Sequence, residues 1–204
     1  ASHAPPTGAI AFGFAGVDGR IAFDLVPGSY TLTAARGPTY ALYPATAAEG
    51  QGAPVTVKPE GSTPFQVELG EAVDTAGLLA GDFHVHAVNS PDSPVLNRDR
   101  VLSFLAEGHD VLVSTDHDYI TDYAPYVQAL GAGAWLATVQ GVELTTFDYG
   151  HFNAFPMIRD PLDILGGVFD WGGATGPARR LPRSLRRSWA ATASSAWCRS
   201  TIPT

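Results

Sequence analysis

The sequence predicts a small antiparallel β-sandwich followed by an α/β region, within one chain of 204 residues. Residues 9–70 alternate apolar and polar positions in short runs bounded by glycine or proline, as half-buried antiparallel strands do. From residue 77 onward, apolar runs alternate with amphipathic helical segments, which is typical of parallel β/α units. A content of 45% hydrophobic and 10% aromatic residues is sufficient for an ordinary globular core.

The predicted sandwich strands are five short runs, AIAFGF, RIAFDL, SYTLTAA, APVTVKP and PFQVEL. In VDGR, residues 17–20, the Asp-Gly pair supplies the positive φ angles of a hairpin turn. The stretch DGRIAFDLVPGSYTLTA resembles carboxypeptidase-regulatory or transthyretin-like β modules, in which a Pro-Gly turn leads into a strand with a tyrosine. Titratable residues do not cluster here, so we expect residues 1–76 to form a β module without chemistry of its own.

The α/β region is predicted over residues 77–177. Its strands are expected in LLAGDFHVHA, DVLVSTDH, WLATVQGVELTT and GHFNAFPM, and its helices over residues 95–107 and 121–132. Gly108 stands where a helix-ending glycine is expected, and His109 follows it as a capping residue. The alternation of strand and helix therefore predicts an α/β architecture for this part of the chain.

The net charge of −8 conceals an uneven distribution. Six of the twelve basic residues follow residue 177, where no acidic residue occurs, so residues 1–177 hold all 20 acidic residues and six basic ones. Such an acidic body repels nucleic acid and suits a site that collects cations. Residues 178–204 also lose the strand and helix periods, which favours an out-of-frame end; a basic disordered tail and a basic helix are the alternatives.

The sequence contains no apolar run that approaches the roughly 20 residues of a membrane-spanning helix. Its single cysteine, Cys198, excludes an internal disulfide and leaves the redox compartment open. The chain begins at Ala1 without a charged and apolar leader, which indicates either a removed signal or a fragment.

Ligand-type side chains follow each apolar run of the α/β region. Alternate side chains of a strand share a face, so His84 and His86 can contact one ion, although a His-x-His pair alone also fits exposed or hydrogen-bonded histidines. Charged groups at buried strand ends need metals or partners, so four such ends in succession predict a metal site. Its candidate residues are His84, His86, Asp92, Asp116, His117, Glu143 and His151.

The motifs DFHVHAVNSPDS, STDHD, GVELTT and GHFNAFP, in this order, resemble those of the PHP (polymerase and histidinol phosphatase) metallohydrolases. With a β module ahead of them, they are most similar to the carbaryl-hydrolase-like (CehA/McbA-type) branch. The resemblance covers residues 78–177. It implies a partial, distorted (β/α)7 barrel, incomplete at its C-terminal end, and two or three divalent metal ions (Zn, Mn or Fe).

The resemblance also implies roles for the residues of the first, third and fourth motifs. His84 and His86 match ligands of one ion, and Glu143 matches a carboxylate that bridges this ion to a second. His151 matches a ligand of the second ion. Catalysis is expected to involve His84, His86 and Glu143 directly.

Asp92 and His117 match ligands of a third ion. Asp116 or Asp118 is expected to orient His117, since carboxylates commonly hold a ligating imidazole in the required tautomer, and Asp116 is also expected to act beside His117 in catalysis. No histidine follows His151, so the later ligands of the family are missing and we expect the activity of this chain to be impaired.

The implied chemistry is hydrolysis of an ester, carbamate or phosphoester bond in a small molecule by a metal-bound hydroxide. The alternative is a non-catalytic protein that binds metal or mediates surface contacts through the β module. A sandwich module ahead of a hydrolase, in a chain with one cysteine, favours a secreted or periplasmic location.

Overall fold

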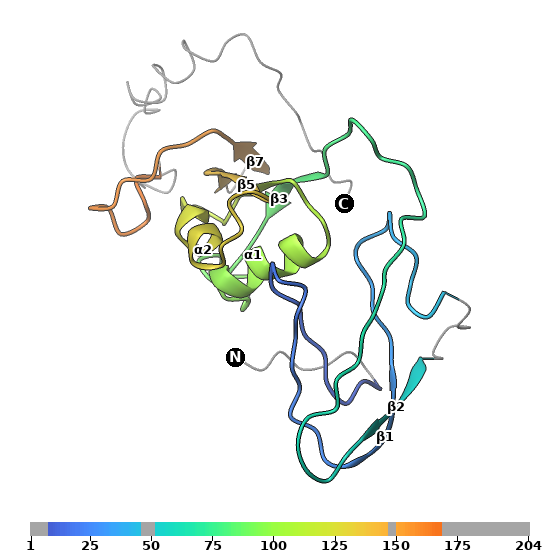
Figure 1. Ribbon diagram of the computed structural model, residues 1–204. Coiled ribbons are helices and arrows are strands. Elements are labelled where there is room, and N and C mark those ends of the chain that lie inside the picture. The colour runs from blue at the N-terminus through green and yellow to red at the C-terminus, as the bar shows by residue number, and fades with distance from the viewer. Residues whose placement is uncertain (1–7, 46–51, 147–149, 169–204) are drawn as a thin grey trace, which may run out of the picture. The chain divides into compact units, whose positions relative to one another are not determined.

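The computed structural model describes residues 8–45, 52–146 and 150–168 (Figure 1). The basic segment 178–204 predicted from sequence lies outside these residues. The described elements are β1 (Gly28–Leu32), β2 (Ala53–Val57), β3 (Gly81–Val85), α1 (Asn97–Ala106), β4 (Val111–Ser114), α2 (Ala124–Ala129), β5 (Ala137–Val139), β6 (Val142–Thr145) and β7 (His151–Ala154). Neither described helix has the length and apolar character needed to cross a membrane.

The chain divides into two compact units, and each is built from separate stretches of sequence. Of the described residues, the first unit contains 8–45, 52–81, 98–111 and 126–137. The second contains 82–97, 112–125, 138–146 and 150–168. The domain boundary predicted at residue 76 was inferred from the change in sequence pattern, and it stays a prediction.

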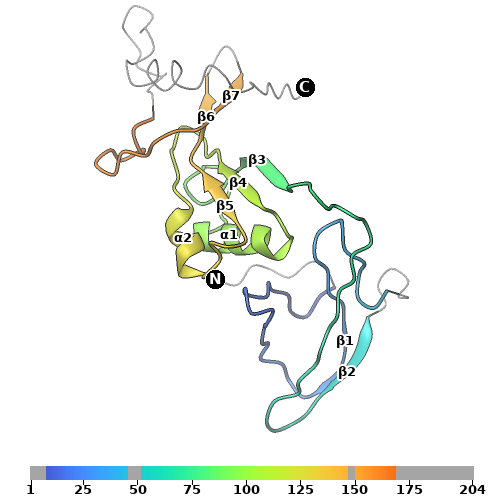
Figure 2. The ribbon, with the colours of Figure 1, turned by 45° about the horizontal axis from the view of Figure 1, so that its top comes forward.

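In the first unit, β1 and β2 pair antiparallel, with Tyr30 opposite Val55 (Figures 1 and 2). The predicted turn at residues 17–20 forms: Gly19 adopts φ +69°, and the Gly16 amide donates to the Arg20 carbonyl at 3.2 Å. The runs on either side of this turn are irregular. They expose apolar side chains, among them Ile21 at 45% and Phe23 at 41%, because no second sheet covers them in the described part of the chain.

The predicted fold class is wrong for the residues that the structure describes. Their strands form a two-stranded sheet β1–β2, a three-stranded sheet β3–β4–β5 and a two-stranded sheet β6–β7 (Figure 2). These small sheets make neither a sandwich of packed sheets nor part of a (β/α)7 barrel. The β6–β7 pair is antiparallel, with Glu143 opposite Asn153. Parallel pairing needs a crossover of about a dozen residues or more, and Thr145 and His151 are too close in sequence for one.

A further departure from the predicted α/β pattern lies within WLATVQGVELTT. This run is two strands, β5 and β6, which belong to different sheets and are separated by Gln140 and Gly141. A Cβ at Gly141 would lie 2.6 Å from the Ser114 carbonyl oxygen and 3.0 Å from that of Ala154. The backbone segments therefore approach one another at Gly141 more closely than any other residue type allows.

Both predicted helices are confirmed in place, with shorter bounds. α1 ends where Gly108 adopts φ +81°; its amide donates to Leu105, and the His109 amide donates to Phe104 at 3.0 Å. This pair of hydrogen bonds is a Schellman motif, so His109 closes the helix through its backbone. α2 begins after Asp122, whose carboxylate accepts from the amide of the first helical residue at 2.9 Å.

The core of the second unit surrounds the C-terminal ends of β3 and β4. Its fully or nearly buried apolar side chains are Val85, Ala87, Leu112, Val113, Ile120, Tyr123 and Val142. The Val85 amide donates to Thr115 Oγ1 at 2.8 Å, and the Thr115 amide donates back to the Val85 carbonyl at 2.9 Å. These bonds fix the two strand ends side by side, and the polar residues that follow each strand are brought together as a result.

Candidate metal centre

All six predicted metal ligands lie together in the second unit. His84 is on β3 and His86 directly follows it; Glu143 is on β6, and His151 begins β7. The ligand atoms form three overlapping groups, each within 4.8 Å: His84, His86 and Glu143; His86, Asp92 and His117; and His117, Glu143 and His151. These residues can therefore hold a metal ion.

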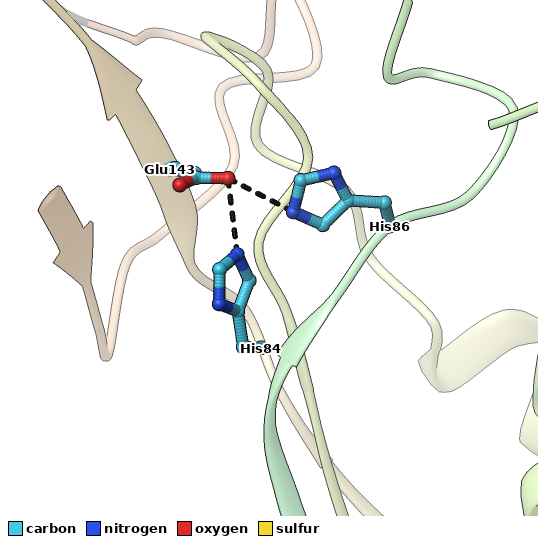
Figure 3. Close-up of side chains that lie close together, drawn as sticks. All are labelled: His84, His86 and Glu143. Carbon is cyan, nitrogen blue, oxygen red and sulfur yellow. Dashed lines mark hydrogen bonds and ion pairs between the residues drawn. The ribbon is translucent and has the colours of Figure 1, made fainter. Parts of the chain in front are cut away.

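Glu143 is the centre of the cluster, and only 4% of it is exposed. Its Oε2 lies 3.1 Å from His84 Nε2 and 2.9 Å from His86 Nε2, so both imidazoles point at one oxygen (Figure 3). Its Oε1 lies 3.2 Å from His151 Nδ1. A carboxylate buried to this extent needs positive partners, and each of its oxygens faces a different part of the histidine cluster.

Asp92 lies on the other side of His86. Its carboxylate oxygens are 3.0 and 3.1 Å from His86 Nδ1, and Oδ2 is 3.5 Å from His117 Nε2. The Ser90 hydroxyl donates to Asp92 Oδ1 at 2.7 Å, and this hydrogen bond is the main reason that the pKa of Asp92 falls to about 2. Asp92 therefore stays ionised and able to bind a cation at any ordinary pH.

The loop after β4 is attached to β6 by backbone hydrogen bonds. Asp118 has a left-handed backbone, φ +49°, which aspartate tolerates better than most residues. Its amide donates to the Glu143 carbonyl at 2.9 Å, and its side chain accepts from the Thr145 amide at 3.0 Å. His117 is consequently held beside Glu143, with which it forms a parallel bridge.

Asp116 is fully buried but belongs to none of the three ligand groups. Its Oδ1 accepts from the Ala87 amide at 2.6 Å, and its Oδ2 accepts from the Thr121 hydroxyl. Burial raises the pKa of Asp116 above its usual value. The carboxylate links the segment after β3 to the segment after β4, and neither of these bonds is to His117. Its predicted orienting role and its part in catalysis both stay predictions.

The distances within the cluster fit a bound ion. Two ligands with bonds of roughly 2.0–2.2 Å to one metal lie about 2.8–3.6 Å apart at octahedral or tetrahedral angles. The imidazole–carboxylate separations run from 2.9 Å between His86 and Glu143 to 3.5 Å between His117 and Asp92. His86 Nε2 is buried and has no hydrogen-bond partner among the described residues, although Glu143 Oε2 is near it. An ion between these two atoms would satisfy both.

The surroundings of His86 assign its ring proton. Nδ1 faces both Asp92 oxygens and the Ser90 Oγ, at 3.0 to 3.2 Å, and all three can accept. A neutral imidazole has one N–H and one lone pair, so a proton on Nδ1 leaves Nε2 as the ligand atom. With its proton on Nδ1, His86 can offer Nε2 as a ligand in the group with His84 and Glu143 and can donate a hydrogen bond to Asp92.

Sequence reasoning missed two residues that position the ligands, Ser90 and Thr145, and named Asp118 only as an alternative to Asp116 for orienting His117. Each lies within one of the quoted motifs, one or two residues from a ligand. Ser90 is 3% exposed, and its Oγ also accepts from the His117 amide at 3.2 Å, so it contacts every member of the His86, Asp92 and His117 group. Short polar side chains are common in loops, so only proximity in sequence to the ligands could have indicated them.

Comparisons with models of protein families, with curated proteins and with solved structures find no match for this chain. The resemblance to PHP metallohydrolases therefore stays a prediction, and the functional inference rests on the residues of the site.

Proposed function

We propose that this chain is a metal-dependent hydrolase of the PHP type, which cleaves ester, carbamate or phosphoester bonds in small molecules. The observation that carries the proposal is the position of Glu143, whose two carboxylate oxygens face His84 and His86 on one side and His151 on the other. This arrangement suits two ions that share one carboxylate. The ligand groups come together among the described residues without a barrel, and the proposed chemistry depends on these ligands.

The donor set narrows the choice of metal. Imidazole nitrogens mixed with carboxylate oxygens suit Zn, Mn or Fe, whereas sites made only of oxygen favour Mg and Ca. His84, His86, His151 and the two oxygens of Glu143 supply ligands for two ions. Asp92 and His117 offer two further ligands, which makes two or three ions the expected content.

Ions bound in such a centre lower the pKa of a coordinated water and polarise the oxygen of the bond under attack. The protein has to keep imidazole ligands neutral and carboxylate ligands ionised, and it has to hold both in fixed positions. Glu143 is buried and directed by four histidines, so its geometry is determined before substrate arrives. Asp92 is a weak base because its pKa is about 2, so it acts as an ionised ligand and not as a proton acceptor.

The test measures metal content and turnover together on the full chain. The wild-type protein, loaded with Zn²⁺ or Mn²⁺, is assayed with an aryl phosphate, an aryl acetate and an aryl carbamate. Glu143→Gln keeps the size of the side chain and removes its charge, so it should lose bound metal and at least 100-fold in turnover, in the range of a removed metal-site interaction. Glu60→Gln, the same change at an exposed residue, is the control.

The proposal is supported if the protein hydrolyses one of the three ester classes and this turnover falls in Glu143→Gln but not in Glu60→Gln. Stoichiometric metal binding with no turnover of any of the three classes contradicts it. That result would favour the alternative, a metal-binding protein without catalysis.

A further inference from the structure

We propose that Thr145 is a positioning residue: its hydroxyl holds the proton of His117 on Nδ1 and directs Nε2 to the ion that His117 shares with Asp92. This role rests on the proposed metal-dependent function and extends it to a residue outside the ligand set. Thr145 ends β6, two residues after Glu143 and on the same face of that strand.

The hydrogen bond between the two side chains is short. His117 Nδ1 lies 2.6 Å from Thr145 Oγ1, closer than any other oxygen near this ring. The Thr145 amide donates to Asp118, which holds the backbone of Thr145 against the loop that carries His117. The side-chain hydrogen bond to His117 and the backbone hydrogen bond to Asp118 together fix the Thr145 hydroxyl relative to the His117 ring.

The direction of this hydrogen bond follows from the neighbours of the hydroxyl. The Thr145 hydroxyl has a second acceptor within reach, the Glu143 carbonyl at 3.5 Å, so its proton can lie there while the lone pairs of Oγ1 accept from His117. Carboxylate oxygens lie 3.5 Å from each ring nitrogen, whereas Thr145 Oγ1 lies 2.6 Å from Nδ1. Thr145 is thus the nearest acceptor, and the proton of the neutral ring belongs on Nδ1.

The position of the proton on His117 determines which of two possible ion sites His117 can serve as a ligand. His117 belongs both to the group with Asp92 and to the group with Glu143 and His151. Its Nε2 lies 3.5 Å from Asp92 Oδ2, a separation within the range of two ligands of one ion. With Nδ1 occupied by Thr145, the lone pair of Nε2 makes His117 a ligand beside Asp92.

His86 shows the same arrangement, because Ser90 and Asp92 face its Nδ1 while Nε2 is left for the metal. A ligating histidine commonly donates its second ring N–H to such a partner, and loss of the partner typically weakens metal binding by about 10–100-fold. Thr145 is expected to contribute an effect of this size.

The first experiment determines the tautomer in the metal-free full chain. Two-bond ¹H–¹⁵N NMR spectra of the imidazoles distinguish a proton on Nδ1 from one on Nε2, and the signals of His117 are identified by their absence in His117→Gln. We expect the Nδ1–H form in the wild type. The Nε2–H form in the wild type would overturn the proposal without any variant.

The second experiment measures Zn²⁺ binding by titration calorimetry in three variants. Thr145→Val keeps the shape and removes the hydroxyl, so affinity for Zn²⁺ should fall about 10–100-fold. Thr145→Ser keeps the hydroxyl and should bind like the wild type. Thr146→Val is the matched control, since the Thr146 hydroxyl donates to the Gly150 carbonyl and not to His117.

A double-mutant cycle locates the affected ion. If Thr145 acts through His117 at Asp92, adding Thr145→Val to Asp92→Asn should produce little further loss, because the shared site is already weakened. Full additivity, or unchanged Zn²⁺ affinity in Thr145→Val, would overturn the proposal. None of these measurements involves turnover, so a protein that shows them and hydrolyses no ester would contradict the proposed function and leave the role of Thr145 intact.

Discussion

Short polar side chains form hydrogen bonds that orient the candidate ligands of this site. In the proposed centre, Glu143, His84 and His86 would supply ligand atoms, while Ser90 and Thr145 face the ring nitrogens of His86 and His117 that would carry a proton. Metal chemistry depends on this choice because only a nitrogen with a lone pair can bind an ion. The side chains that hold a ligand are thus as much a part of the site as the ligand itself.

Asp116 is a fully buried carboxylate whose contribution to the stability of the fold can be measured. Asp116→Ala removes the acceptor of the buried Ala87 amide, and such an unsatisfied group costs about 1–3 kcal/mol in free energy of unfolding. Asp116→Asn retains an acceptor oxygen and removes a charge that burial disfavours, as the raised pKa of Asp116 indicates, so it should cost less than the alanine. Urea unfolding of the metal-free protein measures both.

Asp24→Ala, at an exposed aspartate, serves as the control for these two variants and should change the free energy of unfolding by less than about 0.5 kcal/mol. An asparagine variant that unfolds more easily than the alanine variant would show that the charge of Asp116, and not its hydrogen bond, is what the fold requires.

At the scale of the elements, local signals in the sequence were reliable and pairing was not. The two helices and the turn at residues 17–20 form where capping, glycine and Asp-Gly signals placed them, because these features depend on neighbouring residues. Strand pairing depends on distant residues. The run over residues 135–146 reads as one apolar strand, and only the close backbone approach at Gly141 shows why it divides between two sheets.

The site was easier to predict than the fold that carries it. His84, Glu143 and His151 come together in the second unit although the predicted barrel does not form among the described residues. Their residue types and order in the sequence indicate metal chemistry directly, whereas a barrel requires a particular set of strand neighbours. The role of Thr145 could not be predicted, since its hydrogen bond joins the end of β6 to the loop after β4 and is visible only in three dimensions.

The close backbone approach at Gly141, between β5 and β6, can be tested by a substitution. Gly141→Ala would place a Cβ 2.6 Å from the Ser114 carbonyl oxygen, and the backbone must shift to accommodate it. Overpacking of this kind costs roughly 1–3 kcal/mol, and because β6 carries Glu143, Zn²⁺ affinity should fall together with stability. Thermal unfolding and calorimetric titration with Zn²⁺ measure the two effects.

Gly133→Ala is the matched control, since a Cβ at Gly133 meets no atom within 4 Å. It should leave both quantities close to those of the wild type. If Gly141→Ala also left them unchanged, the close approach at Gly141 would have no part in holding the site.

For the whole molecule, the cluster joins parts of the chain that are far apart in sequence. Its ligands run from His84 to His151 and come from β3, the loops after β3 and β4, β6 and β7. Each sheet that contributes is small, with three strands at most among the described residues. Small sheets bury little apolar surface, so an ion that binds several segments at once should supply a large share of the stability of the second unit.

Metal removal should therefore destabilise the protein. A ligand that binds only the folded state raises the free energy of unfolding by about 2.7 kcal/mol at a free concentration 100 times its dissociation constant. Zn²⁺ should therefore raise the urea midpoint of the wild-type chain, and EDTA should reverse the shift. Glu143→Gln should show little response, since Glu143 contacts His84, His86 and His151 at once. An equal response of wild type and Glu143→Gln would place the stabilising ion elsewhere in the chain.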